Sequence, residues 1–414
     1  MATTTINTSA PLSTTVSEAL KEHYKPQRIK NMVYQNNPLL GLMPKYEKFG
    51  GENMPIPIIV TGPQRRSADF EAAQTNTSTS TVRQFQLTRV KDYSFAAIEH
   101  EALKASQSNV DAFVRYATME IDGAIHALKR SMAVAMYRDG TGAIGQQNSS
   151  DPGGGTTLTL TNAADSSNFE VGMNIVLAAS TTGALLSNVG TKTITAIDRD
   201  AGTLTVSTLH GDADAGDYFF QEGDAHAGAS YKKMRGLEAW VPSSAPSSAA
   251  FFNVDRTADV TRLGGIRYDG SALPIEEALI GGASQVAREG GTPTHCFMDF
   301  DSYANLEKAL GSKVVYDRVK SADADVGFDS MTVQGPKGRI QIIPDHNCQP
   351  NVAWMLQLDT WSLNTLGPAP QILDADGAGT LLRVHSLDAY ECRVGMYGNV
   401  ACNAPGYNAR IALA

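Results

Sequence analysis

"VDAFVRYATMEIDGAIHALKRSMAVAMYRDGTG", residues 110–142, is the most regular stretch of a 414-residue chain that is otherwise rich in Gly, Ser, Thr and Asp. Its apolar residues recur every three or four positions, which is the spacing of one helix face. They are Val110, Val114, Ala117, Ile121, Ile125, Leu128, Met132 and Met136. Gly140 and Gly142 end the pattern. A helix from Val110 to Arg138 would span about 43 Å, so we expect it to lie across a sheet or along an extended body.

The segment before this helix predicts a long two-stranded β-ribbon. The run MPIPIIV, residues 54–60, predicts a strand whose two prolines restrict it to an edge. Residues 61–81 are polar, and Phe85, Leu87, Tyr93 and Phe95 then alternate as in a second strand. Two strands alone are only marginally stable in water, so we expect the ribbon to lean on another surface.

The N-terminal segment carries an apolar patch without a local core. Residues 1–15 are rich in Thr and Ser, and residues 16–27 predict a short helix. Leu39, Leu40 and Leu42 follow in a segment punctuated by Pro and Gly, and they are exposed unless something covers them. Such a patch favours docking onto another body.

The segment after the long helix is strongly acidic and consists of short strand-like runs. Residues 151–224 contain ten Asp and Glu against Lys192 and Arg199, which leaves eight excess negative charges out of a chain total of −9. Residues 1–66 hold eight basic residues against four acidic ones. This polarity suits head-to-tail contact between copies, with two solvated faces as the alternative. Six or so short strands in this segment predict a small β-barrel or sandwich inserted as a separate module.

The remainder of the chain mixes helices and strands, so the fold class is α+β. Residues 273–291 predict a helix, THCFMDF predicts a buried strand, and DSYANLEKALG predicts a helix capped by Asp301. The stretch from Leu381 to Pro405 is long and strand-like.

Composition and motifs favour no catalytic or metal site. The chain is 42% hydrophobic, and no apolar run approaches the ~18 residues of a membrane span. The start of the chain lacks the features of a secretory signal. The cysteines Cys296, Cys348, Cys392 and Cys402 form no C-x-x-C pair and predict buried free thiols in a reducing compartment.

Individual candidates for chemistry each have a simpler explanation. His295–Cys296 and His346-x-Cys348 lie about 50 residues apart, which is unlike zinc ligand spacing. The acidic pair in "DADGAG", Asp374 and Asp376, lacks the rest of a calcium loop and predicts a turn. Asp323 and Asp325 lie in a polar linker, and nucleophile and phosphate-loop motifs are absent from the sequence. We therefore expect no metal, no cofactor and no enzymatic activity.

The order of parts resembles the major capsid proteins of tailed bacteriophages, which have the Hong Kong 97-like fold. The resemblance is carried by NPLLGLMPKYEKFGGENMPIPI, by residues 93–142, by MRGLEAWV, by TPTHCFMDFDSYANLEKAL and by ECRVGMYGNVACNAP. It implies an N-arm at residues 1–50, an E-loop at 51–99, and a P-domain with its spine helix at 100–150. It further implies an inserted small all-β domain at 151–226, most of the A-domain at 227–360, and return strands of the P-domain with the end of the A-domain at 361–414.

This resemblance implies a protein that assembles with itself, as hexamers and pentamers, into an icosahedral shell around double-stranded DNA. The implied location is the virion, after assembly in the host cytoplasm. Scaffolding, portal and decoration proteins are further implied partners, the DNA contact has no sequence specificity, and no membrane contact is implied. The residues proposed to contact neighbouring copies are Arg65, Arg66, Asp374, Asp376, Leu39, Leu40 and Leu42.

One departure from the family and several alternatives stay open. Some relatives join an E-loop lysine to an asparagine of a neighbour, but residues 61–81 contain no lysine and "DADGAG" contains no asparagine. We therefore expect no covalent cross-link, and Arg65 and Arg66 pairing with Asp374 or Asp376 of the next copy is the expected replacement. The alternatives are an encapsulin-like nanocompartment shell, a phage tail or adhesin protein with a glycan-binding β-module, and an enzyme.

Overall fold

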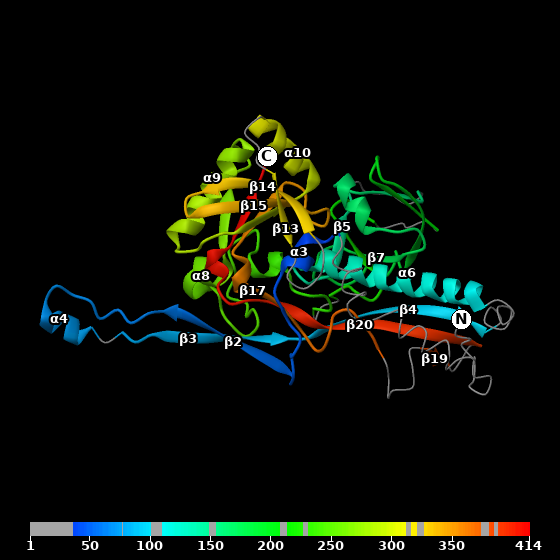
Figure 1. Ribbon diagram of the computed structural model, residues 1–414, viewed down its shortest axis with the longest axis horizontal. Coiled ribbons are helices and arrows are strands. Elements are labelled where there is room, and N and C mark those ends of the chain that lie inside the picture. Colours follow the sequence, from blue (N-terminus) through cyan, green and yellow to red (C-terminus); the bar gives the residue numbers. More distant parts are fainter. Residues whose placement is uncertain are drawn as a thin grey trace, which may run out of the picture.

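The computed structural model describes residues 36–76, 78–100, 110–148, 155–207, 213–226, 231–311, 316–320, 327–373, 381–384 and 388–414. Within these ranges the strands form three sheets and one two-stranded ribbon, with helices covering two of the sheets (Figure 1). The predicted α+β class is confirmed. The predicted N-terminal helix at residues 16–27 and the turn around Asp374 lie outside the described residues.

The long helix α6 forms as predicted and lies along a six-stranded sheet (Figure 1). It runs Val110–Tyr137 and contacts strand β4 (Val90–Glu99) and strand β20 (Ala389–Cys402). The side chains of residues 110–117 lie outside the described part, and the rest of the predicted stripe is buried: Ile121, Ile125, Leu128, Met132 and Met136. These apolar side chains fix the helix on the sheet because they leave water on packing.

Strand β20 is the centre of this six-stranded sheet. Its residues 389–398 pair antiparallel with β4, so that residues 90–99 lie beside the last long strand of the chain. The other members are short: β1 (Lys45–Tyr46), β17 (Trp361–Thr365), β18 (Gln371–Ile372) and β19 (Leu382–Arg383).

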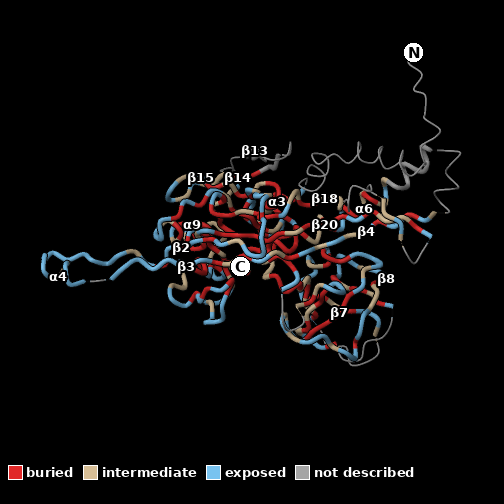
Figure 2. The backbone as a smooth tube through the Cα atoms, turned by 90° about the horizontal axis from the view of Figure 1, so that it is seen from below, coloured by how far each residue is buried: buried red, intermediate tan, exposed pale blue. Residues whose placement is uncertain are grey.

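The β-ribbon extends from this body as a projecting arm, with its far part pale blue for exposed residues (Figures 1 and 2). It consists of β2 (Asn53–Thr61) paired antiparallel with β3 (Thr81–Thr88). Its tip contains the short helix α4 (Phe70–Thr75), which is capped by the Asp69 side chain. No residue of α4 is buried in the chain, so the tip has no core of its own.

A seven-stranded mixed sheet forms the second half of the body. Its strands are β11 (Ile266–Asp269), β21 (Ala409–Ala412), β16 (Val352–Leu356), β12 (His295–Met298), β15 (Gly338–Pro344), β14 (Gly327–Gly335) and β13 (Tyr316–Lys320), in spatial order. The nearby helices are α7 (Leu237–Trp240), α8 (Val260–Gly264), α9 (Ile275–Arg288) and α10 (Phe300–Leu310). The chain therefore ends inside this sheet, on β21.

The cap of α10 differs from the prediction. Asp299, and not Asp301, is the N-cap residue, because its carboxylate accepts hydrogen bonds from the backbone N–H groups of Asp301 and Ser302. Asp301 lies in the first turn instead, where its negative charge is favourable near the helix N-terminus.

The acidic segment forms a six-stranded antiparallel sheet with a separate apolar cluster, called the β-unit here (residues 143–221). Its strands are β5 (Ala143–Gln146), β10 (Tyr218–Gln221), β7 (Asn174–Ala178), β8 (Lys192–Asp198), β9 (Thr203–Val206) and β6 (Thr157–Thr159), in spatial order. Strand β5 precedes the expected start at residue 151, because the chain enters the sheet directly after α6. The sheet therefore includes residues 143–146, which were expected to belong to segment 100–150 and not to the inserted domain at 151–226.

The apolar patch of the N-terminal segment is covered by the same chain. Leu39 and Leu40 lie on helix α3 (Pro38–Leu42) and are each 1% exposed, and Leu42 packs at the margin of the same core. The expectation that these leucines need a second body to cover them is therefore corrected. The four cysteines are buried and unpaired, as predicted.

Candidate assembly surfaces

One face of the β-ribbon exposes apolar side chains to solvent. Ile59 and Val82 are directly opposite each other across β2 and β3, and they are 61% and 59% exposed. Phe70 at the tip is 82% exposed. A row of exposed apolar side chains along a projecting arm is typical of a surface that contacts another molecule.

The other face of the ribbon is anchored on the body. Phe85 of β3 is fully buried, and its ring meets the rings of Trp240 and Phe251 edge to face at centroid distances of 5.0 and 6.1 Å. Arg262 donates a hydrogen bond through Nη1 to the carbonyl oxygen of Val60, at 2.6 Å. These contacts hold the base of the ribbon and leave the tip free.

The predicted contact residues are divided between the surface and the core. Arg65 and Arg66 lie beside α4 in the exposed ribbon tip. Asp374 and Asp376 lie outside the described residues, so the predicted charge pairing with a neighbour stays a prediction. Leu39 and Leu40 are held inside the chain, and the backbone N–H of Leu39 donates to Oδ2 of Asp345 at 3.4 Å.

Asp345 is a buried carboxylate that links the N-terminal segment to α6. It accepts hydrogen bonds from the hydroxyl of Tyr137, at 2.8 Å, and from the backbone and side-chain nitrogens of Asn347. Burial raises the pKa of Asp345, and the hydrogen bonds from Asn347 and Tyr137 act in the opposite direction. This carboxylate fixes helix α3 against the end of α6.

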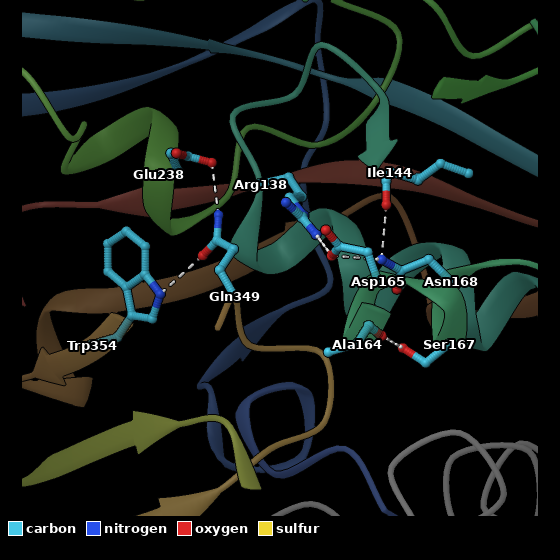
Figure 3. A network of polar contacts seen from close by, with 9 residues as sticks. All are labelled: Arg138, Ile144, Ala164, Asp165, Ser167, Asn168, Glu238, Gln349 and Trp354. Atoms are coloured by element: carbon cyan, nitrogen blue, oxygen red, sulfur yellow. Dashed lines mark hydrogen bonds and ion pairs between the residues drawn. The ribbon is translucent and has the colours of Figure 1, made fainter. Parts of the chain in front are cut away.

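Ion pairs join the β-unit to α6. Arg130 pairs with Glu170, and Arg138 donates through Nη2 to Oδ1 of Asp165 at 2.9 Å. Figure 3 shows this second pair at the end of α6, beside the hydrogen bond from Asn168 to the carbonyl oxygen of Ile144 and the separate chain from Trp354 through Gln349 to Glu238. Two acidic groups of the β-unit are thus neutralised, one by Arg130 of α6 and one by Arg138, which directly follows α6; the sequence alone did not indicate these pairs.

A third contact at this junction is a largely buried charge cluster. Nζ of Lys233 lies 2.9 Å from Oδ2 of Asp92 and 2.8 Å from Oδ2 of Asp224, and it also bonds Oγ of Ser131 at 2.7 Å. The pKa of Lys233 is raised, because the two carboxylates outweigh the effect of burial. The pKa of Asp224 is also raised, because for this group burial outweighs the lysine. The cluster borders a cavity of about 470 Å³ between α6, β4 and the β-unit.

Among the described residues, no group of three or more His, Cys, Asp or Glu side chains has the arrangement of a metal site. His295 and Cys296 lie on β12, and Cys348 lies beside this strand, with its Sγ 4.0 Å from the carbonyl oxygen of Phe297; burial raises the pKa of the Cys296 thiol to about 12. None of the described helices has the length and apolar character needed to cross a membrane.

The fold is thus a mixed α+β body with a projecting ribbon whose tip is exposed. A family model described as SU10 major capsid protein matches residues 215–379, about two fifths of the chain. A search of curated proteins finds no match.

Several solved structures are similar in fold at low sequence identity. The cyanophage A-1(L) capsid is 11% identical, with 91% of this chain and 92% of that chain covered and a TM-score of 0.48. The capsid of a native GTA particle is 7% identical, with coverage of 93% and 91% and a TM-score of 0.45. The capsid of Myoviridae phage XM1 is 9% identical, with coverage of 92% of both chains and a TM-score of 0.43.

The family match concerns residues 215–379. Over these residues it bears out the predicted resemblance to the major capsid proteins of tailed bacteriophages. The matched segment begins just before β10 of the β-unit and ends after β18. It includes strands β11 to β16 of the seven-stranded sheet. The ribbon, long helix and mixed body on which the prediction depended are present in the described residues, and most of the predicted N-arm, residues 1–35, lies outside them.

Proposed function

We propose that the chain assembles with copies of itself into the closed icosahedral head of a tailed bacteriophage, as hexamers and pentamers around double-stranded DNA. The observation that carries this proposal is the ribbon, whose base is buried on the body while Ile59, Val82 and Phe70 remain exposed. A surface of that kind gains stability when a neighbouring copy covers it. The family match supports the same function.

Charge complementarity adds a second component to the proposed contact. Arg65 and Arg66 at the ribbon tip are exposed, and we propose that they meet Asp374 or Asp376 of the next copy. One exposed pair contributes only about 0–1 kcal/mol, but the same pair recurs many times around a shell. No covalent cross-link is proposed, since residues 61–81 contain no lysine.

The β-unit is proposed to be an inserted domain on the outer surface of the head. Its separate apolar cluster supports independent folding, and Asp198, Asp200 and Asp214 are exposed on it. We propose that its remaining acidic charge keeps particles apart or binds a decoration protein. Scaffolding and portal partners and assembly in the host cytoplasm belong to the same proposal.

The proposal is tested by shortening the ribbon. Replacing residues 64–79 by a short Gly/Ser turn removes the tip and leaves the anchor around Phe85 intact. The shortened chain is expected to fold with an unchanged far-ultraviolet circular dichroism spectrum and to form no shells by electron microscopy. Normal shells from this variant would contradict the proposed role of the ribbon.

A further inference from the structure

A polar cavity lies where the ribbon joins the body, and it is called the ribbon-base pocket here. Its volume is about 490 Å³. The polar residues that line it come from the ribbon and from the body: Asn53, Gln86, Thr88, Arg89, Tyr231, Arg235, Asn253 and Asn399. Among the described residues that line this pocket there are two arginines and no carboxylate.

Aromatic rings hold the guanidinium group of Arg235 in place. Its Cζ lies 3.5 Å from the ring centroid of Tyr231 and 4.6 Å from that of Phe252. Its backbone N–H donates to Oδ1 of Asn399 at 2.9 Å, and its aliphatic stem lies close against Gly140. Rings cover the faces of a planar guanidinium, so its N–H donors remain available at the edge for a ligand.

Neither lining arginine has an anionic partner among the described residues. Arg89 donates through Nη1 to the carbonyl oxygen of Phe49 at 2.8 Å. Within the described residues, neither Arg89 nor Arg235 forms an ion pair. Behind them Arg256 is buried, with its Cζ 4.0 Å from the Phe251 ring centroid. The pKa of Arg256 is lowered to about 10, chiefly by burial and in addition by the charges of Arg235 and Arg267. Positive charge therefore accumulates here with little compensation. Asp139 provides some, since its negative charge acts to raise the pKa of Arg235.

We propose that the ribbon-base pocket binds an oxyanion held by Arg89 from the ribbon and Arg235 from the body. The fork of donors on a guanidinium matches the two oxygens of a phosphate or carboxylate, and the side-chain amides of Asn53 and Asn253 provide neutral donors. Arg89 connects β3 to β4. A bound oxyanion therefore joins the ribbon to the body and restricts the angle between them. Two sources supply this chemistry: free phosphate, and an Asp or Glu side chain of a second copy.

Inorganic phosphate is the probe for a test that does not depend on shell formation. The purified chain is kept dilute and monomeric, as verified by light scattering, and its melting temperature is measured in phosphate and in chloride at equal ionic strength. Phosphate is expected to raise the melting temperature in a saturable way, since a ligand that binds only the native state stabilises it. Arg235→Gln is expected to raise the apparent Kd for phosphate by about tenfold or more, which is the usual effect of losing a charge-assisted hydrogen bond.

Two further variants separate binding from folding. Asn253→Asp places a carboxylate at an exposed position whose positive φ suits Asp as well as Asn, so the chain is expected to fold and to lose the phosphate response. Arg339→Gln removes an exposed arginine of β15 outside the pocket and is expected to keep the response. A response that is absent in the native chain, or that is equal in all the variants, overturns the proposal.

Association measurements then identify the source of the oxyanion. If phosphate also slows self-association in the native chain but not in Arg235→Gln, the pocket receives a carboxylate from a second copy. If phosphate binds in a pocket-dependent way without changing association, the ligand is the free anion. Both results support the oxyanion site, and a chain that binds phosphate but forms no shells contradicts only the proposed capsid function.

Discussion

The ring of Phe85 in the ribbon meets the ring of Trp240 in the body edge to face, with the ring centroids 5.0 Å apart. Phe85→Ala is expected to lower the free energy of unfolding by about 3–5 kcal/mol, because a buried aromatic side chain is lost and a cavity remains. Urea unfolding of the dilute chain measures this loss. Val82→Ala on the exposed face of the same strand is the control, with an expected change within ~0.5 kcal/mol. Equal losses in the two variants would mean that the ribbon is not anchored through this ring.

The exposed pair Ile59 and Val82 is expected to act on assembly and not on folding. The double variant Ile59→Ser, Val82→Ser removes apolar surface that a single chain leaves in water, so its urea midpoint is expected to stay close to that of the native chain. Shell formation is expected to fall sharply, as measured by sedimentation of the assembled fraction. An unchanged assembled fraction is the result that argues against a role for this face.

Charge reversal at the ribbon tip tests the proposed pairing of Arg65 and Arg66. Arg65→Glu with Arg66→Glu is expected to weaken assembly most at low salt, since exposed charges are increasingly screened as ionic strength rises. Lys337→Glu, in the exposed turn between β14 and β15, is the matched control. If both variants assemble as the native chain does at every salt concentration, the tip arginines form no such contact.

The cluster around Lys233 predicts a pH-dependent effect on stability. The pKa of Lys233 is raised above its usual 10.5, so its contribution is fully present at neutral pH and is lost only as the pH rises through the folded value. Lys233→Met leaves Asp92 and Asp224 without their cation and is expected to cost about 3–5 kcal/mol at pH 7.

Acid is expected to reduce the cost of Lys233→Met. The pKa of Asp224 is already raised by burial, so a carboxylate without the lysine takes up a proton more readily as the pH falls. Unfolding of the native chain and of the variant at pH 7 and pH 4.5 measures the difference. A cost that is the same at both values contradicts the assignment of Lys233 as the counterion.

The sequence predicted those parts whose pattern is local. The stripe of α6 at Ile121, Ile125 and Leu128 was visible because the same 3.6-residue period that forms a helix also buries one face. The ribbon was visible in part, because alternation in β3 and prolines in β2 are local features. Tyr93 and Phe95 were expected on its second strand, but they lie on β4, which pairs with β20. Both strands of the ribbon were also expected to need support from another surface.

Other parts depended on contacts between residues far apart in the chain. Leu39 and Leu40 were expected to be covered by another body, because nothing nearby in sequence indicates that Asp345 and Tyr137 lie beside helix α3. The anchor of the ribbon combines Phe85 with Trp240, and no local pattern connects them. For the same reason the sequence did not show that Arg138, directly after α6, neutralises part of the β-unit.

Electron microscopy of the purified native chain tests the central claim most directly. If a single copy leaves its ribbon uncovered and a neighbouring copy completes it, the protein forms closed shells of uniform diameter, and a reconstruction places each ribbon tip on an adjacent subunit. A preparation that remains monomeric over a wide range of concentration and salt, or shells in which the ribbon contacts only its own chain, would contradict the account.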